Sequence, residues 1–337
     1  MRVCTQLGTF GSVHDWLGCP VDAWEHSQVA DRKVASVAAL TAMTAAAGLA
    51  WSISETHRFR IRPEHLSILP AGAPPLKLLH LSDLHMTPDQ GRKKQWVSRL
   101  AEWDPDLVVA TGDFLAHPAS VPVALDALTP LLDVPGLFVL GSNDYFAPRP
   151  GNPASYLRGP SELAGNREPL PWGDLVAGLT SAGWVDLDNH RADLKLGKLT
   201  LDVRGVDDPH IDLDDYAAVA GNFDFTADLR LGVTHAPYRR ILDAMSGDGA
   251  DLILAGHTHG GQLRLPGYGA LVTNCDVPRQ MARGLHQYPA DLPGATWLQV
   301  SAGLGQSPYA PIRFACPPEA VLLTLVGSDY SDDPPLG

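Results

Sequence analysis

The stretch Lys77-Leu-Leu-His-Leu-Ser-Asp-Leu-His85 decides how the rest of the chain is interpreted. Its first half is a short apolar run with the length of a buried strand. Its end turns polar, with Asp83 and His85 two residues apart. In a strand that keeps its pleat, side chains at positions i and i+2 point the same way, so this carboxylate and imidazole would both reach one divalent cation. An isolated Asp-x-His is more often a turn cap beside a surface histidine. A metal site is therefore predicted only if later segments supply further ligands.

Four later segments repeat this form, in which a short apolar run ends in residues that bind metals. The runs are Asp106–Thr111, Gly136–Leu140, Leu229–Val233 and Asp251–Ala255. The polar residues that follow them are Asp113, Asn143 or Asp144, His235, and His257 with His259. The carboxyl ends of strands in an α/β sheet meet at one edge, where such folds place ligand sites. We therefore expect these side chains to converge on one centre.

The chemistry of these side chains indicates which metals would suit such a centre. Mixed imidazole and carboxylate ligands suit Mn, Fe, Zn or Co. The four cysteines form no Cys-x-x-Cys pair, which excludes a thiolate zinc site of the usual spacing and any obvious disulfide framework. They are Cys4, Cys19, Cys275 and Cys316.

Composition narrows the class of protein further. The chain has 337 residues, of which 45% are hydrophobic and 19% charged, as in a globular protein with a sizeable core. Its formal net charge of -13 argues against a protein that binds nucleic-acid phosphates or anionic membrane surfaces over a large area. A local positive pocket for one small anion stays compatible with this charge, because bound metals add charge that the sequence does not count.

An uncharged, Ala-rich stretch at residues 34–53 is long enough to span a bilayer as a helix. Ala, Ser, Thr and Gly dominate it, so its tendency to insert is weaker than that of a Leu-rich segment. A membrane contact through these residues and a soluble Ala-rich helix both stay open. Arg58, Arg60 and Arg62 follow the stretch, and this small excess of basic residues would place the main domain on the cytoplasmic face.

We expect the chain to have three parts. Residues 1–75 form an N-terminal appendage that contains the apolar helix and ends in a Pro-rich linker. Residues 76–327 form the catalytic domain, and residues 328–337 form a disordered tail. Within the domain, strand-like runs alternate with helical segments, which predicts an α/β fold with parallel pairing and helices over the sheets. Two layers of mixed sheet fit the order of elements better than one, and residues 184–205 are expected to form antiparallel strands.

These motifs together resemble those of the calcineurin-like metallophosphoesterases. The matching blocks are Asp83-x-His85, Gly112-Asp113, Gly141-Ser-Asn-Asp144, Thr234-His-Ala-Pro237 and Gly256-His-Thr-His259. The resemblance covers roughly residues 76–326. The apolar segment ahead of the domain and the Gly-Gly-Gln after the last histidines look like a bacterial branch that is often membrane-associated. It implies a four-layer β-sandwich flanked by α-helices. Relatives elsewhere in the family include enzymes that cleave the pyrophosphate of nucleotide-linked lipid precursors.

The resemblance also implies a role for each matching residue in binding two divalent metal ions. Asp83, His85 and His259 would hold the first ion, and Asp113 would bridge the pair. His235 and His257 would hold the second ion. A hydroxide bridging the two metals would attack phosphorus in line, and the cations would offset the charge of the transition state.

One block departs from the family pattern. The family usually has Gly-Asn-His-Asp, in which Asn binds the second metal and His protonates the leaving group or steadies the phosphate. A gap-free match puts Ser142 at the Asn position and Asn143 at the His position. Since a serine hydroxyl is a poor ligand, we expect Asn143 to bind the metal. His210 is then the candidate for the missing catalytic histidine, although a loop histidine is the commoner case.

Two further residues are candidates for contacts with substrate. Gly260 lies beside the last histidines, where a residue without a side chain allows close approach of a bound phosphate. Arg313 follows Gly303-Leu-Gly305 and could clamp a phosphate, or equally form a structural salt bridge.

The sequence therefore predicts a dinuclear metal-dependent phosphoesterase. The expected cofactors are two ions of Mn, Fe or Zn, and the expected substrate is a small or lipid-linked phosphodiester, phosphomonoester or pyrophosphate. A nuclease of the same fold is an alternative that the net charge disfavours. A degenerate scaffold that binds metals without turnover is the second alternative, motivated by the altered third block.

Overall fold

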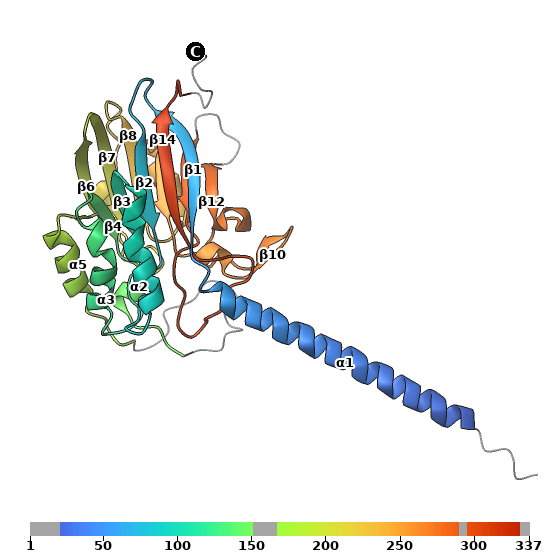
Figure 1. Ribbon diagram of the computed structural model, residues 1–337. Helices are drawn as coiled ribbons and strands as arrows, with labels where there is room; N and C mark the ends of the chain where they lie inside the picture. Colours follow the sequence, from blue (N-terminus) through green and yellow to red (C-terminus); the bar gives the residue numbers. More distant parts are fainter. Residues whose placement is uncertain (1–20, 151–166, 290–294, 331–337) are drawn as a thin grey trace, which may run out of the picture. The chain divides into compact units, whose positions relative to one another are not determined.

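The computed structural model describes residues 21–150, 167–289 and 295–330 of the chain (Figure 1). The chain separates into two compact units, residues 1–50 and residues 51–337. Residues 1–20 of the expected appendage and residues 331–337 of the expected tail lie outside the described residues.

The apolar stretch of the N-terminal region is helical, as the sequence predicts. Helix α1 covers Val21–Glu55, and its segment Arg32–Glu55 is long and apolar enough to cross a membrane. None of the most apolar window of that segment is buried inside the protein. This finding rests on length and composition, which buried core helices and signal sequences share.

The second unit is built on two six-stranded sheets. The first has the strand order β1-β14-β2-β3-β4-β5. Its strands are β1 (Arg60–Leu69), β2 (Leu76–Leu81), β3 (Leu107–Thr111), β4 (Gly136–Val139), β5 (Val185–Asp186) and β14 (Glu319–Gly327). Strands β2 to β5 run parallel to one another, and β14 runs antiparallel to β2. Parallel pairing of the first three predicted strands is thus confirmed.

The second sheet has the order β12-β13-β9-β8-β7-β6. Its strands are β6 (Arg191–Leu196), β7 (Leu199–Val206), β8 (Leu229–Thr234), β9 (Leu252–Ala255), β12 (Gly284–Tyr288) and β13 (Thr296–Val300). Strands β7, β8, β9 and β13 are parallel, and the two edge strands pair antiparallel. A separate two-stranded ribbon is formed by β10 (Arg264–Leu265) and β11 (Gly269–Ala270).

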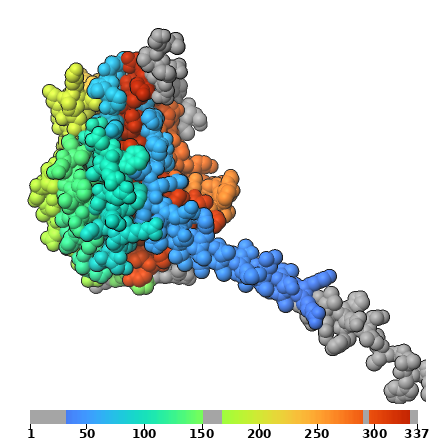
Figure 2. All heavy atoms as spheres, in the orientation of Figure 1, coloured from blue at the N-terminus to red at the C-terminus, as the bar shows by residue number. Residues whose placement is uncertain are grey.

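Helices cover the outer face of each sheet, which gives four layers. Over the first sheet lie α2 (Gly91–Ser98), α3 (Val121–Leu128) and α5 (Trp172–Ser181), whose apolar side chains pack on Leu79 and Leu81. Figure 2 shows the helices of this side as part of one continuous surface. Over the second sheet lies α7 (Arg239–Gly247), packed on Ile253. The predicted sandwich flanked by helices is confirmed.

The core between the two sheets follows from the alternation of side chains along each strand. Leu78 of β2 points between the sheets, while its neighbour Leu79 points to the helices outside. Leu231 of β8 and Leu252 of β9 face Leu78 from the opposite sheet. Because both faces of these central strands are covered, their sequences are almost continuously apolar.

Short helical turns occupy several of the connections. They are α4 (Ser142–Tyr145), α6 (Tyr216–Val219), η1 (Arg99–Trp103), η2 (Thr129–Leu131), η4 (His259–Gly261) and η5 (Arg279–Ala282). Two of them, α4 and η4, begin within the third and last motif blocks, so the chain turns sharply where the candidate ligands lie.

Two features of the sheets differ from the sequence-based expectation. Strand β1 begins at Arg60 and pairs with β14, so the first sheet includes residues ahead of position 76. Strand β5 pairs parallel with β4 in the first sheet, whereas an antiparallel arrangement was expected for residues 184–205. Only the pair β6 and β7 within that segment is antiparallel, because a short turn at Gly197 joins them.

Candidate metal centre

The candidate ligands lie just beyond the carboxyl ends of the central strands, in turns of unusual backbone conformation. Strand β2 ends at Leu81, but the chain continues alongside its neighbour, with Asp83 N donating to Gly112 O over 2.9 Å and His85 N donating to Asp113 O over 2.8 Å. Five candidate ligands have positive φ: Asp83 (51°), His85 (42°), Asp113 (56°), His257 (64°) and His259 (49°).

The backbone at Asp83 and His85 differs from the pleated strand that the sequence predicts there. Asp83 and His85 come together because each occupies a left-handed turn, and the strand does not keep its pleat there. Positive φ costs a residue with a side chain of order 1 kcal/mol or more, and such strain gathers at functional sites. Five strained ligand positions in one place therefore indicate a site that the surrounding fold holds in shape.

Four of the ligands form a compact cluster. The ligand atoms of Asp83, His85, Asp113 and His259 all lie within 4.8 Å of one another, and all four side chains are buried. His85 Nε2 lies 3.3 Å from Asp113 Oδ2, and His259 Nε2 lies 3.8 Å from Asp83 Oδ1. Two atoms bound to one tetrahedral zinc at about 2.1 Å lie about 3.4 Å apart, so this spacing suits a shared cation.

The hydrogen bonding of this cluster supports the same conclusion. Among the described residues, neither ring nitrogen of His85 has a hydrogen-bond partner, and neither does His259 Nδ1. Burial lowers the pKa of His85 to about 4 and holds that of His259 well below its usual value, so both rings are neutral at pH 7. Buried polar atoms without partners cost stability. A cation that accepts their lone pairs would remove that cost.

The two carboxylates differ in their surroundings. Burial raises the pKa of Asp83 to about 6, although Asp83 Oδ2 accepts hydrogen bonds from Ser82 Oγ over 2.6 Å and from His257 N over 3.1 Å. Burial alone would raise the pKa of Asp113, but His235 and His85 beside it lower the pKa below its ordinary value. Asp113 therefore carries a full negative charge between the two groups of histidines.

A second group of ligands lies on the other side of Asp113. His235 Nε2 is 3.6 Å from Asp113 Oδ2, and the rings of His235 and His257 have centroids 5.1 Å apart. His235 Nδ1 donates to Thr111 O over 2.7 Å, which leaves Nε2 facing Asp113. Burial alone would lower the pKa of His235, but Asp113, Asp208 and Asp83 raise it to about 10. The acids thus attract positive charge to this position, as they would a metal ion.

Asn143 also reaches Asp113. Its backbone N donates to Asp113 Oδ1 and its side-chain Nδ2 donates to Asp113 Oδ2, each over 2.8 Å. The amide therefore lies at the shared carboxylate, and a half-turn of the amide would put its oxygen there. Ser142 is buried, with 4% of its surface exposed. Asp144 accepts hydrogen bonds from Asp113 N and Gly141 N, so it holds the turn and does not face the cluster.

His210, the candidate replacement for the missing histidine, lies at the same side of the centre. Its ring centroid is 4.4 Å from that of His257, and its Nδ1 lies 3.0 Å from Tyr238 Oη. The structure thus brings together His210, Asn143 and the six other candidate ligands. The role of each as a ligand or proton donor stays a prediction.

A cavity of about 190 Å³ opens beside this centre. Its walls include His85, Asp113, Asn143, His210, His257 and His259. They also include Arg149 and Arg167, which the sequence analysis missed. Burial lowers the pKa of Arg167, with Arg149 adding to the effect, and among the described residues its buried Nε has no hydrogen-bond partner. The only signal in the sequence was their position at the two ends of a Pro- and Gly-rich segment.

Asp208 is another group that the sequence analysis missed. It is fully buried, its Oδ1 accepts from His210 N over 2.9 Å, and burial raises its pKa to about 7. Its other oxygen, Oδ2, has no hydrogen-bond partner within the described ranges. It precedes His210 in the Gly-Val-Asp-Asp-Pro-His block, so that block as a whole was the available signal.

The two predicted substrate contacts are placed elsewhere. Arg313 is fully buried, and its guanidinium donates to the backbone carbonyls of Ala302, Gly303, Gly305 and Cys316. The structure therefore corrects its expected role as a phosphate clamp to that of a brace for this loop. Gly260 has φ of +64°, and a Cβ there would lie 2.7 Å from Cys316 Sγ. Its lack of a side chain allows this packing, and it is not among the residues that line the cavity.

Comparison with known proteins agrees with this geometry. The family-wide sequence profile described as calcineurin-like phosphoesterase matches residues 76–261. The chain belongs to this family. Asp83, His85, Asp113 and His259, which form the candidate metal-binding cluster, all lie within the matched residues. The protein is therefore a metal-binding member of the metallophosphoesterases.

Curated relatives from two bacteria illustrate the family. The uncharacterized metallophosphoesterase YkuE of Bacillus subtilis is 26% identical over 77% of this chain and 82% of its own length. The phosphodiesterase YaeI of Escherichia coli is 27% identical over 80% of this chain and 88% of its own length. The uncharacterized protein YpbG of Bacillus subtilis is 27% identical over 77% of this chain and 84% of its own length.

Two solved structures align with this chain at low sequence identity. TT1561 of Thermus thermophilus aligns with 68% of this chain and 91% of its own, at 10% identity and a TM-score of 0.41. Phosphopantetheinyl hydrolase of Mycobacterium tuberculosis aligns with 74% of this chain and 96% of its own, at 14% identity and a TM-score of 0.38.

Proposed function

We propose that the protein is a dinuclear metal-dependent phosphoesterase that hydrolyses a phosphodiester, phosphomonoester or pyrophosphate bond. The observation that carries this proposal is the position of Asp113. One of its oxygens lies 3.3 Å from His85 of the compact cluster and 3.6 Å from His235 of the second group. A carboxylate placed between two sets of imidazoles is suited to bridge two cations.

Each ion would have its own set of ligands. Asp83, His85 and His259 would hold one ion, and His235, His257 and Asn143 the other, with Asp113 shared. Divalent cations in such a pair lower the pKa of water and offset the negative charge that develops on phosphoryl oxygens. The ligand chemistry suits Mn, Fe or Zn.

The other side chains around the cavity bind and orient the substrate. Arg149 and Arg167 line its wall, and their guanidinium groups would donate to the non-bridging oxygens of the phosphate. His210 lines the same cavity, so its ring would donate a proton to the leaving oxygen. The cavity of about 190 Å³ accepts a phosphoryl group and a small substituent, while a larger or lipid-linked substituent would extend outside it.

One observation disfavours a nucleic acid as substrate, and a second favours a diester among the other phosphate esters. The net charge of -13 would repel an extended polyanion. The relative YaeI is named a phosphodiesterase, which favours a diester among the possible esters. The apolar segment of α1 would hold the domain at a membrane, on the cytoplasmic face by the excess of Arg residues after it.

A substrate panel with the purified full chain tests the proposal. The panel contains bis(p-nitrophenyl) phosphate, p-nitrophenyl phosphate and a nucleotide-diphospho-lipid, each assayed with Mn and with bound metal counted by mass spectrometry. We expect hydrolysis of at least one ester, with two metals bound per chain. Two bound metals and no hydrolysis of any of them would establish the degenerate scaffold instead. Single-stranded DNA is assayed alongside the panel, and its cleavage in preference to all three would favour the nuclease.

The arginines provide a second test of substrate binding. Arg167→Met should raise KM for the best substrate about tenfold, because a charge-assisted hydrogen bond to phosphate is lost, and should change kcat less. Lys198→Met, at an exposed turn, is the matched control for a lost positive charge. An unchanged KM in Arg167→Met would remove this residue from the proposed site.

A further inference from the structure

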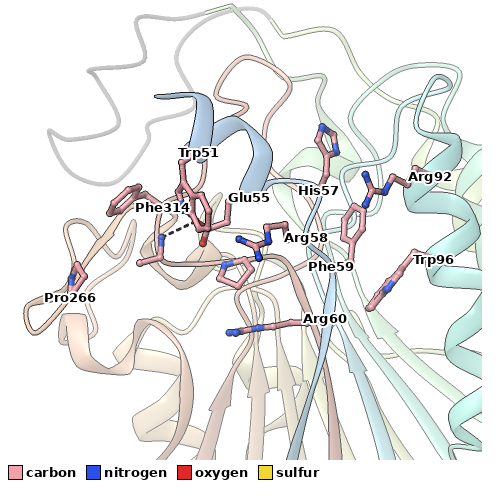
Figure 3. Close-up of a pocket in the computed structure, with 12 residues that line it drawn as sticks. Trp51, Glu55, His57, Arg58, Phe59, Arg60, Arg92, Trp96, Pro266 and Phe314 are labelled. Atoms are coloured by element: carbon pink, nitrogen blue, oxygen red, sulfur yellow. Dashed lines mark hydrogen bonds between the residues drawn. The ribbon is translucent and has the colours of Figure 1, made fainter. Parts of the chain in front are cut away.

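A second and larger cavity, of about 680 Å³, lies where α1 ends. It shares no lining residue with the cavity of the metal centre. Aromatic and basic side chains make up much of its wall: Trp51, Phe59, Trp96, Arg58, Arg60 and Arg92. Figure 3 shows them around the end of the helix, with Phe314 and Pro266 on neighbouring loops.

The basic side chains leave this cavity with a surplus of positive charge. Among the described residues, no carboxylate lies within ion-pair distance of Arg58 or Arg92, and both side chains are exposed. Arg60 pairs with Glu319 over 3.2 Å, but the same buried carboxylate also pairs with Arg62 and Arg283. Since Arg62 also pairs with Glu64, three guanidinium groups share two carboxylates, which leaves a net positive charge.

The acidic residue in the wall, Glu55, offsets only part of this positive charge. Glu55 is 3% exposed, and its carboxylate accepts from Trp51 Nε1 over 2.8 Å. It also accepts from Ala315 N over 3.2 Å and from Cys316 N over 2.6 Å. Glu55 is therefore occupied in fastening the end of α1 to this loop. In a chain with a net charge of -13, a cavity with several basic groups is a marked local exception.

Aromatic side chains also line this cavity. Trp51 is 49% exposed, and the guanidinium of Arg58 lies 4.8 Å from its ring centroid. Phe59 and Trp96 lie 5.5 Å apart by ring centroids. Exposed tryptophan beside arginine is the combination that membrane proteins place at the level of lipid headgroups.

The covalent chain ties this cavity to the apolar segment of α1. Trp51 and Glu55 belong to the segment Arg32–Glu55, which is long enough to cross a membrane, and Arg60 begins β1. Five residues span at most about 18 Å when fully extended. If the segment is in a bilayer, the wall from Trp51 to Arg60 therefore lies close to the lipid headgroups.

We propose that this cavity binds the headgroup of an anionic phospholipid. The phosphate would lie against Arg58 and Arg92, and the glycerol and upper acyl chain against Trp51, Phe59 and Trp96. This inference rests on the cavity and on α1, and it is independent of the proposed phosphoesterase function. It assigns the lipid a role in fixing the domain at the membrane surface.

Native mass spectrometry of the full chain in detergent micelles tests the proposal. The protein is equilibrated with equal amounts of phosphatidylglycerol and phosphatidylcholine, and the lipid retained on each chain is identified. We expect about tenfold more phosphatidylglycerol than phosphatidylcholine. Each basic residue adds favourable binding free energy for a lipid with a net negative charge, which phosphatidylcholine lacks. The double variant Arg58→Gln/Arg92→Gln should lose this preference. Both side chains are exposed, so its thermal unfolding should be unchanged.

Two controls separate the cavity from other sources of lipid binding. The variant Lys195→Gln/Lys198→Gln removes two exposed positive charges from the β6–β7 hairpin and should keep the preference. Inorganic phosphate at millimolar concentration should not displace the lipid. Equal retention of the two lipids by the native chain would overturn the proposal. So would an equal loss of preference in both double variants, or displacement by inorganic phosphate.

Discussion

The two halves of the candidate metal centre share Asp113 but are built differently. In the first half, Asp83, His85 and His259 lie in one compact cluster with Asp113, and its imidazoles have ring nitrogens without partners in the described part of the chain. In the second half, the side chains are held by protein hydrogen bonds: His235 by Thr111 O, His257 by Asn274 O, and Asn143 by Asp113.

This difference has a consequence for metal affinity. The first half offers two carboxylates to a cation, whereas the second offers only the shared one together with neutral ligands. Coulomb attraction to a divalent ion is therefore stronger in the first half. The altered Ser-Asn block also belongs to the second half. The altered block therefore lies in the half where metal binding is expected to be weaker.

Removal of the shared ligand should weaken metal binding in both halves of the centre. Asp113→Ala is expected to lower kcat/KM by about a thousandfold or more, because both cations lose their common ligand and their charge. Hydrolysis of bis(p-nitrophenyl) phosphate, with metal content measured alongside, checks this. Asp113→Asn is the matched variant, since it retains an oxygen in the same place and should bind more metal than the alanine variant. Near-normal turnover in Asp113→Ala would refute the bridging role.

A pair of histidine variants should separate the two halves. Calorimetric titration of the metal-free chain with Mn is expected to show a tighter and a weaker step. His259→Ala should weaken the tighter step about a hundredfold by removing a direct ligand, and His257→Ala should weaken the other. If each variant weakened both steps equally, the two halves would not be separate binding sites.

The proton donor proposed for the second half gives a test that depends on the leaving group. His210→Gln should slow the hydrolysis of an alkyl diester about a hundredfold, because an alkoxide must be protonated as it leaves. Hydrolysis of bis(p-nitrophenyl) phosphate should change little, since nitrophenolate leaves without a proton. A uniform loss with both substrates would show that His210 only positions His257.

The smallest expected effect concerns the altered block itself. Asn143→Ala should lower the affinity for the second metal about tenfold, in line with the loss of one neutral ligand or of its support. Ser142→Ala should leave that affinity within about twofold, because a serine hydroxyl is a weak ligand. The opposite pattern, measured in the same Mn titration, would assign the metal to Ser142.

Sequence reasoning located most of the centre because its signal is local. Each ligand directly follows a short apolar strand, and parallel strands bring such positions to one edge. The left-handed turns at Asp83, His85 and Asp113 could not be predicted, because hydrophobic periodicity reveals strands and helices but not the conformation of single residues after a strand. Those turns decide the direction of each side chain, and the pleat of the strand does not.

The two arginines that are proposed to bind substrate could not be found from the local sequence. Arg149 and Arg167 come from opposite ends of a long segment, and only the folded chain brings them to one cavity. Arg313 was misassigned because a guanidinium group beside a glycine-rich loop can donate to phosphate or to backbone carbonyls, and its complete burial decides for the carbonyls. Strand β1 was missed because the Pro- and Gly-containing residues after it resembled a linker, whereas they form its connection to β2.

The place of β14 between β1 and β2 has a consequence for the order in which the chain matures on the ribosome. Within the described strands, β1 pairs only with β14, although β1 ends at Leu69 and β14 begins only at Glu319. β1 and the apolar helix before it are therefore synthesised long before β14 can pair with them. A nascent chain halted before Glu319 should leave β1 open to protease, and release of the completed chain should protect it.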